Sequence, residues 1–202
     1  MNAHLPNEVV LPPYAGINIG SVRMVLNADD VSAARDILLS SDALGFDTES
    51  KPTFRKGEVS TGPHLIQLAT DTQAFLFPII PAAGAASHAL LAEVLGSSSI
   101  LKAGFGLRDD LKRLKIKLNV DAGNVVDLAV VLRKEPRKDI GAKTAVAMFF
   151  GQRLQKSKSI STTNWANPQL TERQMLYAAD DAHVALRIYR QWVASRQATP
   201  ST

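Results

Sequence analysis

The chain contains 202 residues, of which 46% are hydrophobic and 21% charged, with no cysteine and a formal net charge of +4. This length suits one α/β domain, and the lack of cysteine excludes disulfides, thiolate zinc sites and cysteine nucleophiles and fits a reducing cytoplasm. No run approaches the roughly 18–20 apolar residues of a membrane span, and the N-terminus lacks the pattern of a signal peptide, so we expect no membrane partner and a cytoplasmic location.

Hydrophobic periodicity and turn residues predict the elements in chain order. The first half contains strands at 23–27, 43–48, 64–69, 74–78 and 100–103, with helices at 31–40 and 87–95 between them. The second half is helical, at 107–114, 127–133, 141–150 and 171–195. Asp29 or Asp30 is the expected cap of the first helix, and Thr171 with Gln174 forms a capping box at the start of the last.

This order predicts a mixed β-sheet flanked by helices, in one α/β domain that spans residues 21–196. Residues 1–20 are rich in Pro and Gly and are expected to form an arm over the domain, and residues 197–202 a flexible tail. Basic residues crowd three segments, at 112–117, 133–143 and 153–158. Each segment either contacts a polyanion or forms a solvated surface.

Two acids lie on one face of the predicted strand 43–48 and its end. Side chains two apart in a strand share a face, so Asp47 and Glu49 point the same way and Leu44 and Phe46 point the other way. Neighbouring carboxylates repel each other unless a cation lies between them. The alternative is a solvated strand end at a turn.

The helix at 107–114 distinguishes between two adjacent acids. Leu107, Leu111 and Leu114 recur at helical spacing and form its buried stripe, on which Asp110 also falls, whereas Asp109 lies on the polar side. A buried carboxylate costs several kcal/mol unless it is paired or bound to metal. The alternative for Asp110 is a capping or ion-paired residue near a helix start.

The last helix contains a second adjacent pair of acids. Asp181 shares a face with Tyr177, Val184 and Ile188, and is therefore predicted to point inward, whereas Asp180 lies on a wetter line. A core tyrosine whose hydroxyl is satisfied by Asp181 is the structural alternative for this pair. Together, Asp47, Glu49, Asp110 and Asp181 offer hard oxygen ligands, which favour Mg²⁺ or Mn²⁺, and nucleases hold two such ions about 3.5–4 Å apart.

Three motifs resemble those of the tyrosine-type DEDD 3′-5′ exonucleases, the ribonuclease D-like and Werner-type exonuclease domains. They are Gly-Phe-Asp-Thr-Glu at 45–49, Lys-Ala-Gly-Phe-Gly at 102–106 followed by Asp110, and Tyr-Ala-Ala-Asp-Asp-Ala at 177–182. The resemblance covers about residues 23–195, with the motifs in family order, and includes the Lys-Ser-Lys-Ser-Ile run at 156–160.

The resemblance implies a ribonuclease H-like fold and a two-metal-ion hydrolysis of terminal phosphodiesters from a 3′ end, releasing nucleoside 5′-monophosphates. By this hypothesis Asp47, Glu49 and Asp181 hold one cation, Asp47 and Asp110 (through water) hold the second, and Tyr177 positions the attacking water. The expected partner is single-stranded or 3′-ended RNA or DNA, and the resemblance does not choose between them.

Five residues are candidates for contacts with the substrate. The backbone N–H of Thr48 is expected at the terminal ribose, and Phe54 and Phe105 either stack on bases or belong to the core. Lys156 and Lys158 either contact phosphates or lie in a solvated loop.

Three other functions fit parts of the sequence. A non-catalytic nucleic-acid-binding module would use the basic segments but needs no inward acids. An aspartyl-phosphate phosphatase could use Asp47 as nucleophile and Glu49 as acid, but that class usually has Asp at the second position, and Tyr177 with Asp181 would be unexplained. A structural scaffold does not explain acids on three separate apolar stripes.

Overall fold

The computed structural model of the chain describes residues 10–55, 57–80 and 84–198. In this part of the chain, six strands form one sheet in the order β1-β4-β3-β2-β5-β6. The strands are β1 (Val22–Met24), β2 (Ala43–Glu49), β3 (Leu65–Ala69), β4 (Ala74–Pro78), β5 (Leu101–Gly104) and β6 (Val125–Asp127). The sheet is mixed, because β2, β3 and β4 run antiparallel whereas β1 pairs with β4, and β5 with β2 and β6, in parallel. The predicted mixed α/β architecture is confirmed.

The helices follow the predicted order with changes at their ends. They are η1 (Ile19–Ser21), α1 (Ala28–Leu39), α2 (Gly84–Gly96), α3 (Arg108–Leu118), α4 (Leu128–Val131), α5 (Ala142–Phe150), α6 (Lys158–Ser161) and α7 (Glu172–Gln197). The sequence analysis missed α6 and β6, both too short for a periodic pattern. Among the described residues, no helix has the length and apolar character needed to cross a membrane.

The cap of α1 differs from the prediction, which named Asp29 or Asp30. Asn27 caps this helix by accepting the backbone N–H of Asp30, and the Asp30 carboxylate in return accepts the N–H of Asn27. Asp30 is thus the second member of a capping box, three residues inside the helix. At α7 the predicted box of Thr171 and Gln174 is present.

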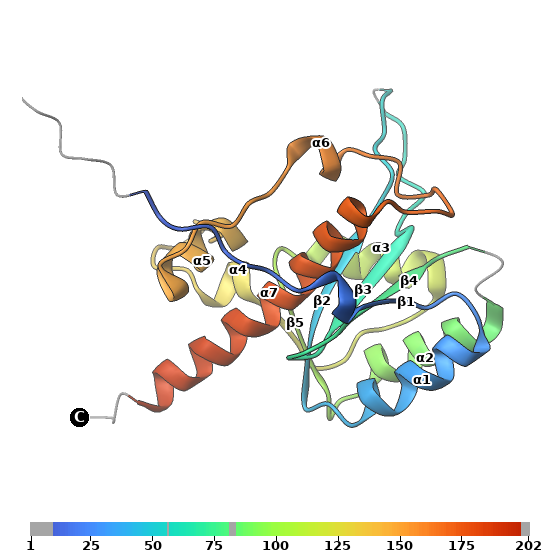
Figure 1. Ribbon diagram of the computed structural model, residues 1–202, viewed down its shortest axis with the longest axis horizontal. Coiled ribbons are helices and arrows are strands. Elements are labelled where there is room, and N and C mark those ends of the chain that lie inside the picture. Colours follow the sequence, from blue (N-terminus) through green and yellow to red (C-terminus); the bar gives the residue numbers. More distant parts are fainter. Residues whose placement is uncertain (1–9, 56, 81–83, 199–202) are drawn as a thin grey trace, which may run out of the picture.

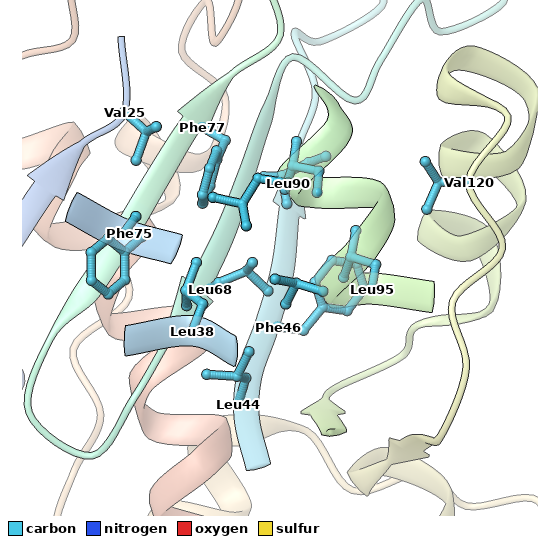
Figure 2. Close-up of a cluster of buried hydrophobic side chains, with 14 of the residues drawn as sticks. Val25, Leu38, Leu44, Phe46, Leu68, Phe75, Phe77, Leu90, Leu95 and Val120 are labelled. Atoms are coloured by element: carbon cyan, nitrogen blue, oxygen red, sulfur yellow. The ribbon is translucent and has the colours of Figure 1, made fainter. Parts of the chain in front are cut away.

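One face of the sheet packs against α1 and α2. Leu44 and Phe46 of β2 point into this layer and are fully buried in a cluster that includes Leu38 of α1 and Leu90 of α2 (Figure 2). Because side chains alternate along a strand, Gly45, Asp47 and the end of β2 at Glu49 face the other layer. The apolar half of β2 therefore anchors a strand whose other face carries the acids.

Helix α7 crosses that other face of the sheet, as the long diagonal ribbon in Figure 1. Its contact surface consists of small residues, with Ala178, Ala179 and Ala182 fully buried. The approach is closest at Gly45, where an added Cβ would lie only 1.8 Å from the carbonyl oxygen of Ala182. The glycine thus sets how near α7 lies to β2.

Ion pairs hold the second half of α7 on the sheet. Arg190 donates from both terminal nitrogens to the Asp42 carboxylate at 2.6 Å, directly before β2, and also reaches Asp71 in the β3–β4 turn at 3.2 Å. The Arg190 guanidinium lowers the pKa of Asp42 to about 2. Helix α7 is therefore fixed by charge, as well as by packing, to the end of the antiparallel β2–β3 pair where β2 begins and β3 ends.

Residues 10–18 run beside α7 (Figure 1). Pro13 forms a parallel bridge with Arg153, the Tyr14 N–H donates to the Arg153 carbonyl at 3.0 Å, and the Ile17 N–H donates to Asp180 at 2.7 Å. Residues 1–9 of the expected arm and residues 199–202 of the expected tail lie outside the described residues.

We predict that Gly45→Ala destabilises the fold and weakens any activity of the acid site. The added methyl must push α7 away from β2, which costs about 1–3 kcal/mol for an overpacked core, or a fall in Tm of roughly 2–12 °C for a domain of this size. Thermal unfolding measures it. Gly96→Ala is the control, because its Cβ would meet only the Asp121 carbonyl oxygen at 3.6 Å, and it should leave Tm almost unchanged. Equal Tm values for the two variants would contradict the proposed constraint.

Candidate active site

The strand β2 presents Asp47 and Glu49 toward α7. Between them Thr48 is buried on the opposite face, where its hydroxyl donates to Asp110 at 2.6 Å. The backbone N–H of Thr48, predicted to contact a terminal ribose, donates to the side chain of Asp47 at 2.9 Å in this structure. Thr48 thus links the acids of β2 to the acid of α3.

Asp110 lies in the first turn of α3 and is half-buried, whereas Asp109 beside it is exposed. Burial raises the pKa of Asp110, and the hydrogen bond from Thr48 and the charge of Arg113 oppose that rise. The helical phase that separated Asp110 from Asp109 in the sequence thus matches the burial of the two side chains.

Two further residues bring α3 to β2. A Cβ at Gly104 would lie 2.4 Å from the Phe46 carbonyl oxygen, so only glycine allows β5 to end so close to β2. Asp127, at the end of β6, accepts the N–H groups of Gly106 and Leu107 at 2.8 and 3.0 Å, directly before α3. The sequence analysis missed this role of Asp127, because nothing local connects it with residues twenty positions earlier.

Asp181 is brought to the β2 acids by α7 and is buried. The ammonium of Lys156 lies 2.8 Å from its carboxylate, with the Asp181 side chain 6% and the Lys156 side chain 29% exposed. Burial raises the pKa of Asp181, and Lys156 opposes the rise. The predicted phosphate contact Lys156 is therefore, in this structure, the counter-ion of the acid site.

Close acids perturb one another in this site. Burial, then the charge of Asp181, raises the pKa of Asp47 to about 8. Burial, then the charges of Asp47 and Asp181, raises the pKa of Glu49 to about 9. The charge of Asp110 also raises the pKa of both groups. The four acids of the predicted site thus belong to one electrostatic cluster, drawn from β2, α3 and α7.

Asp180 differs from the prediction that it faces solvent. It is only partly exposed, because the arm covers it, and its carboxylate accepts the N–H of Ile17. Burial raises its pKa to about 6. Helical phase predicts that Asp180 and Asp181 point in different directions. It does not predict the arm that packs against Asp180, because the arm comes from more than 160 positions earlier in the chain.

Tyr177 lies one turn before Asp181 on α7. Its ring packs against the buried Trp165, with the centroids 6.0 Å apart, and the Lys156 ammonium lies 5.9 Å from its centroid. Burial and the charge of Asp181 raise its pKa to about 12, so its hydroxyl stays protonated at neutral pH. Trp165 donates from its indole to the Ser161 carbonyl at 3.2 Å and ties α6 to this corner.

The other predicted substrate contacts lie in different surroundings. Phe54 is 86% exposed in the loop after β2, so it is not a core residue. Phe105 is half-buried and packs on the hydrophobic cluster around Leu128 and Leu132. Lys158 is exposed on α6, outside the ion pair that Lys156 makes.

Among the described residues, no three Asp, Glu or His side chains converge closely enough, as they stand, to hold a metal ion. Two of the acids already have partners within the protein, since Asp181 pairs with Lys156 and Asp110 accepts a hydrogen bond from the Thr48 hydroxyl. The donor set nevertheless fits a divalent cation: it consists of carboxylate oxygens whose ionised forms repel, and a cation already neutralises one of them. Binding at Asp181 would require Lys156 to move away.

Comparisons with known proteins agree with this geometry. The family model described as 3′-5′ exonuclease matches residues 22–193. The chain belongs to the 3′-5′ exonuclease family. It is 32% identical over 178 residues to the mouse bifunctional 3′-5′ exonuclease/ATP-dependent helicase WRN, covering 85% of this chain but 13% of that protein. It is 27% identical over 198 residues to the human exonuclease mut-7 homolog, covering 84% of this chain and 22% of that protein.

Solved structures share the fold of this exonuclease domain. The EXO domain of Nibbler from Aedes aegypti matches with a TM-score of 0.76 and 24% identity, over 90% of this chain and 91% of that one. Ribonuclease D from Trypanosoma brucei, solved with RNA U12, matches with a TM-score of 0.75 and 21% identity, over 85% and 62%. The predicted ribonuclease D-like family and ribonuclease H-like fold are thus confirmed.

We predict that the metal-free protein loses stability as the pH rises from about 4 to about 9. The folded pKa values of Asp47 and Glu49, about 8 and about 9, lie above their ordinary values, so the folded state binds more protons in this range and its stability falls as they leave. Tm measured in EDTA at pH 5–9 tests this. Glu49→Gln cannot ionise and should give a shallower fall, whereas Glu135→Gln, on the α4–α5 loop, should keep the wild-type slope. Identical slopes for all three proteins would contradict the assignment.

We predict that Lys156→Met destabilises the metal-free protein, since it leaves the buried Asp181 without its counter-ion. A lost hydrogen bond to a charged group costs about 2 kcal/mol, which for this length lowers Tm by about 4–8 °C. Mn²⁺ should then raise the Tm of the variant more than that of the wild type, because no ammonium competes at Asp181. Lys158→Met, exposed two residues away, is the matched control, and the same response in both variants would refute the competition.

Proposed function

We propose that this chain is a metal-dependent 3′-5′ exonuclease that hydrolyses the terminal phosphodiester of RNA or DNA and releases nucleoside 5′-monophosphates. The observation that carries the proposal is that acids from β2, α3 and α7 lie within electrostatic reach of one another beside Tyr177, in a domain of the 3′-5′ exonuclease family. We further propose that Asp47, Glu49, Asp110 and Asp181 hold two divalent cations, Mg²⁺ or Mn²⁺.

When bound, such cations polarise the scissile phosphate, activate the attacking water and stabilise the leaving oxygen. Carboxylate donors without cysteine favour Mg²⁺ or Mn²⁺ over softer metals. The charges of both Asp110 and Asp181 act on the pKa of Asp47. Asp47 on β2 is therefore the acid that we propose to bind both ions. Asp110 is held toward the site by the Thr48 hydroxyl.

Two residues of the chain would act on water and phosphate. The pKa of the Tyr177 hydroxyl is about 12, so the hydroxyl stays protonated at neutral pH. It can therefore donate a hydrogen bond that orients the attacking water, without acting as a base itself. Lys156, once released from Asp181, would carry its positive charge to a substrate phosphate. The same lysine would then neutralise the acids before substrate binds and the phosphate afterwards.

The competing functions explain less of this site. A binding module or a scaffold leaves unexplained why buried acids that repel one another are gathered beside a single lysine. A phosphatase that uses Asp47 and Glu49 alone has no role for Asp110, Asp181 and Tyr177. RNA is the first substrate to test, because one structural relative was solved with RNA. DNA is the second, and cytoplasmic action remains part of the proposal.

We predict that the purified protein with Mn²⁺ or Mg²⁺ shortens 5′-labelled RNA or DNA stepwise from the 3′ end, and that EDTA stops the reaction. Asp47→Asn should lower kcat by more than about 100-fold, because it weakens both metal positions. Tyr177→Phe should lower kcat by about 10–100-fold without changing Mn²⁺ binding, measured by calorimetry. Tyr189→Phe, on the same helix, is the control. Persistent laddering in Asp47→Asn, or no shortening of any substrate by the wild type, would overturn the proposal.

A further inference from the structure

A groove of about 730 Å³ is lined in part by Tyr177. It lies between the arm, the segment from α5 to α6 and the first turns of α7. The residues that matter for its charge or its walls are Tyr14, Lys143, Arg153, Lys156, Arg173 and Asp180. Four of these six side chains are basic, and among the described residues Asp180 is the one acid of the lining.

Lys156 pairs with Asp181, but the other three cations of this groove form no ion pair among the described residues. Lys143, Arg153 and Arg173 are exposed, and within the described residues none of them forms an ion pair. Some basic residues elsewhere are neutralised by an acid, since Lys115 pairs with Asp121 and Lys138 with Glu135. Unpaired charges of one sign that face the same groove raise its positive potential and attract a polyanion.

The arm supplies a hydrogen-bond partner for the acid of this groove. The carboxylate of Asp180 is turned to the N–H of Ile17, and Gly16, at φ +70°, lies so close that a Cβ would be 2.5 Å from Asp180 Oδ1. The arm is itself fixed at the groove, because Pro13 and Tyr14 bond to the backbone of Arg153. Docking of the arm therefore builds a wall of the groove and satisfies one oxygen of the acid.

The groove leads into the acid site. Lys156 and Tyr177 line it, and the same lysine lies 2.8 Å from Asp181. Tyr14 offers no free face for a base, because its ring stacks on Phe150 at 5.8 Å and the Arg187 guanidinium lies 5.4 Å from its centroid. The groove thus presents charge without a stacking platform, a combination that suits a phosphate backbone of any sequence.

We infer that this groove binds the phosphodiester backbone of the nucleic-acid strand whose 3′ end lies at the acid site. The inference rests on the proposed exonuclease function and names the path of its substrate. A continuous strand fits better than a single released nucleotide, because the three unpaired cations come from three segments: α5, the α5–α6 loop and the first turn of α7.

Anisotropy of a 5′-fluorescein single-stranded 12-mer, in EDTA so that nothing is cleaved, tests the inference. Arg153→Ala combined with Arg173→Ala should reduce the slope of log K against log salt by about 1.4, since each single-strand phosphate contact contributes about 0.7. At about 0.15 M salt this weakens binding roughly tenfold. Arg153→Lys with Arg173→Lys keeps the charges and should keep the slope. Lys134→Ala with Lys138→Ala removes two charges outside the groove and should also keep it.

Two outcomes overturn the inference. An equal loss of 12-mer affinity in the Lys134→Ala/Lys138→Ala variant would mean that only the total charge of the protein matters. An unchanged 12-mer affinity in the Arg153/Arg173 pair, with weaker inhibition by nucleoside 5′-monophosphates, would assign the groove to the product.

Cleavage separates this inference from the proposed function. With Mn²⁺, the Arg153→Ala/Arg173→Ala variant should raise KM for the 12-mer, whereas the Lys134→Ala/Lys138→Ala variant should keep the wild-type KM. Cleavage by the wild type together with wild-type binding by the Arg153/Arg173 pair defeats the inference alone. Lost binding by the Arg153/Arg173 pair in a protein that cleaves nothing defeats the exonuclease proposal alone.

Discussion

The close approach of α7 to β2 is the constraint on which the site depends. A glycine at position 45 and alanines on the helix let the backbone of α7 come into contact with the strand. That contact places Asp181 within the electrostatic reach of Asp47 and Glu49. The stability of the opposite face, where Leu44 and Phe46 are buried, holds the strand against the repulsion of these acids. One strand thus supplies the anchor on one side and the chemistry on the other.

Gathering the acids creates a need for positive charge, and Lys156 meets it in this structure. A cation bound at Asp181 would have to displace this ammonium. A site of this kind need not be preformed, because a divalent cation can take the place of the ammonium and relieve the same repulsion. The exchange would also free the loop that carries Lys156, so that metal binding and the position of this loop are coupled through one ion pair.

Much of this arrangement could be predicted from local patterns in the sequence. Strand alternation put Asp47 and Glu49 on one face, and helical phase separated Asp110 from Asp109. The patterns did not find the roles of Asp127, Lys156 and Asp180, because each depends on a partner from a distant segment: α3, α7 and the arm. Periodicity reports which way a side chain points relative to its own element, and it contains no information on what covers that side chain. The same limit explains the cap of α1. Residue type predicted a single capping residue, Asp29 or Asp30, whereas Asn27 and Asp30 each accept a backbone N–H from the other.

These distant contacts all affect the distribution of charge around the acid site. An acidic site repels the polyanion on which it is proposed to act, so the substrate must be attracted by charges outside the site. The unpaired cations beside the arm provide that attraction, and the arm donates a backbone N–H to Asp180, the acid in the same lining. Lys156 stands where the two regions meet, paired to an acid and lining the basic groove. A strand drawn along the groove would therefore meet, at its 3′ end, the one lysine whose displacement opens the acids to metal.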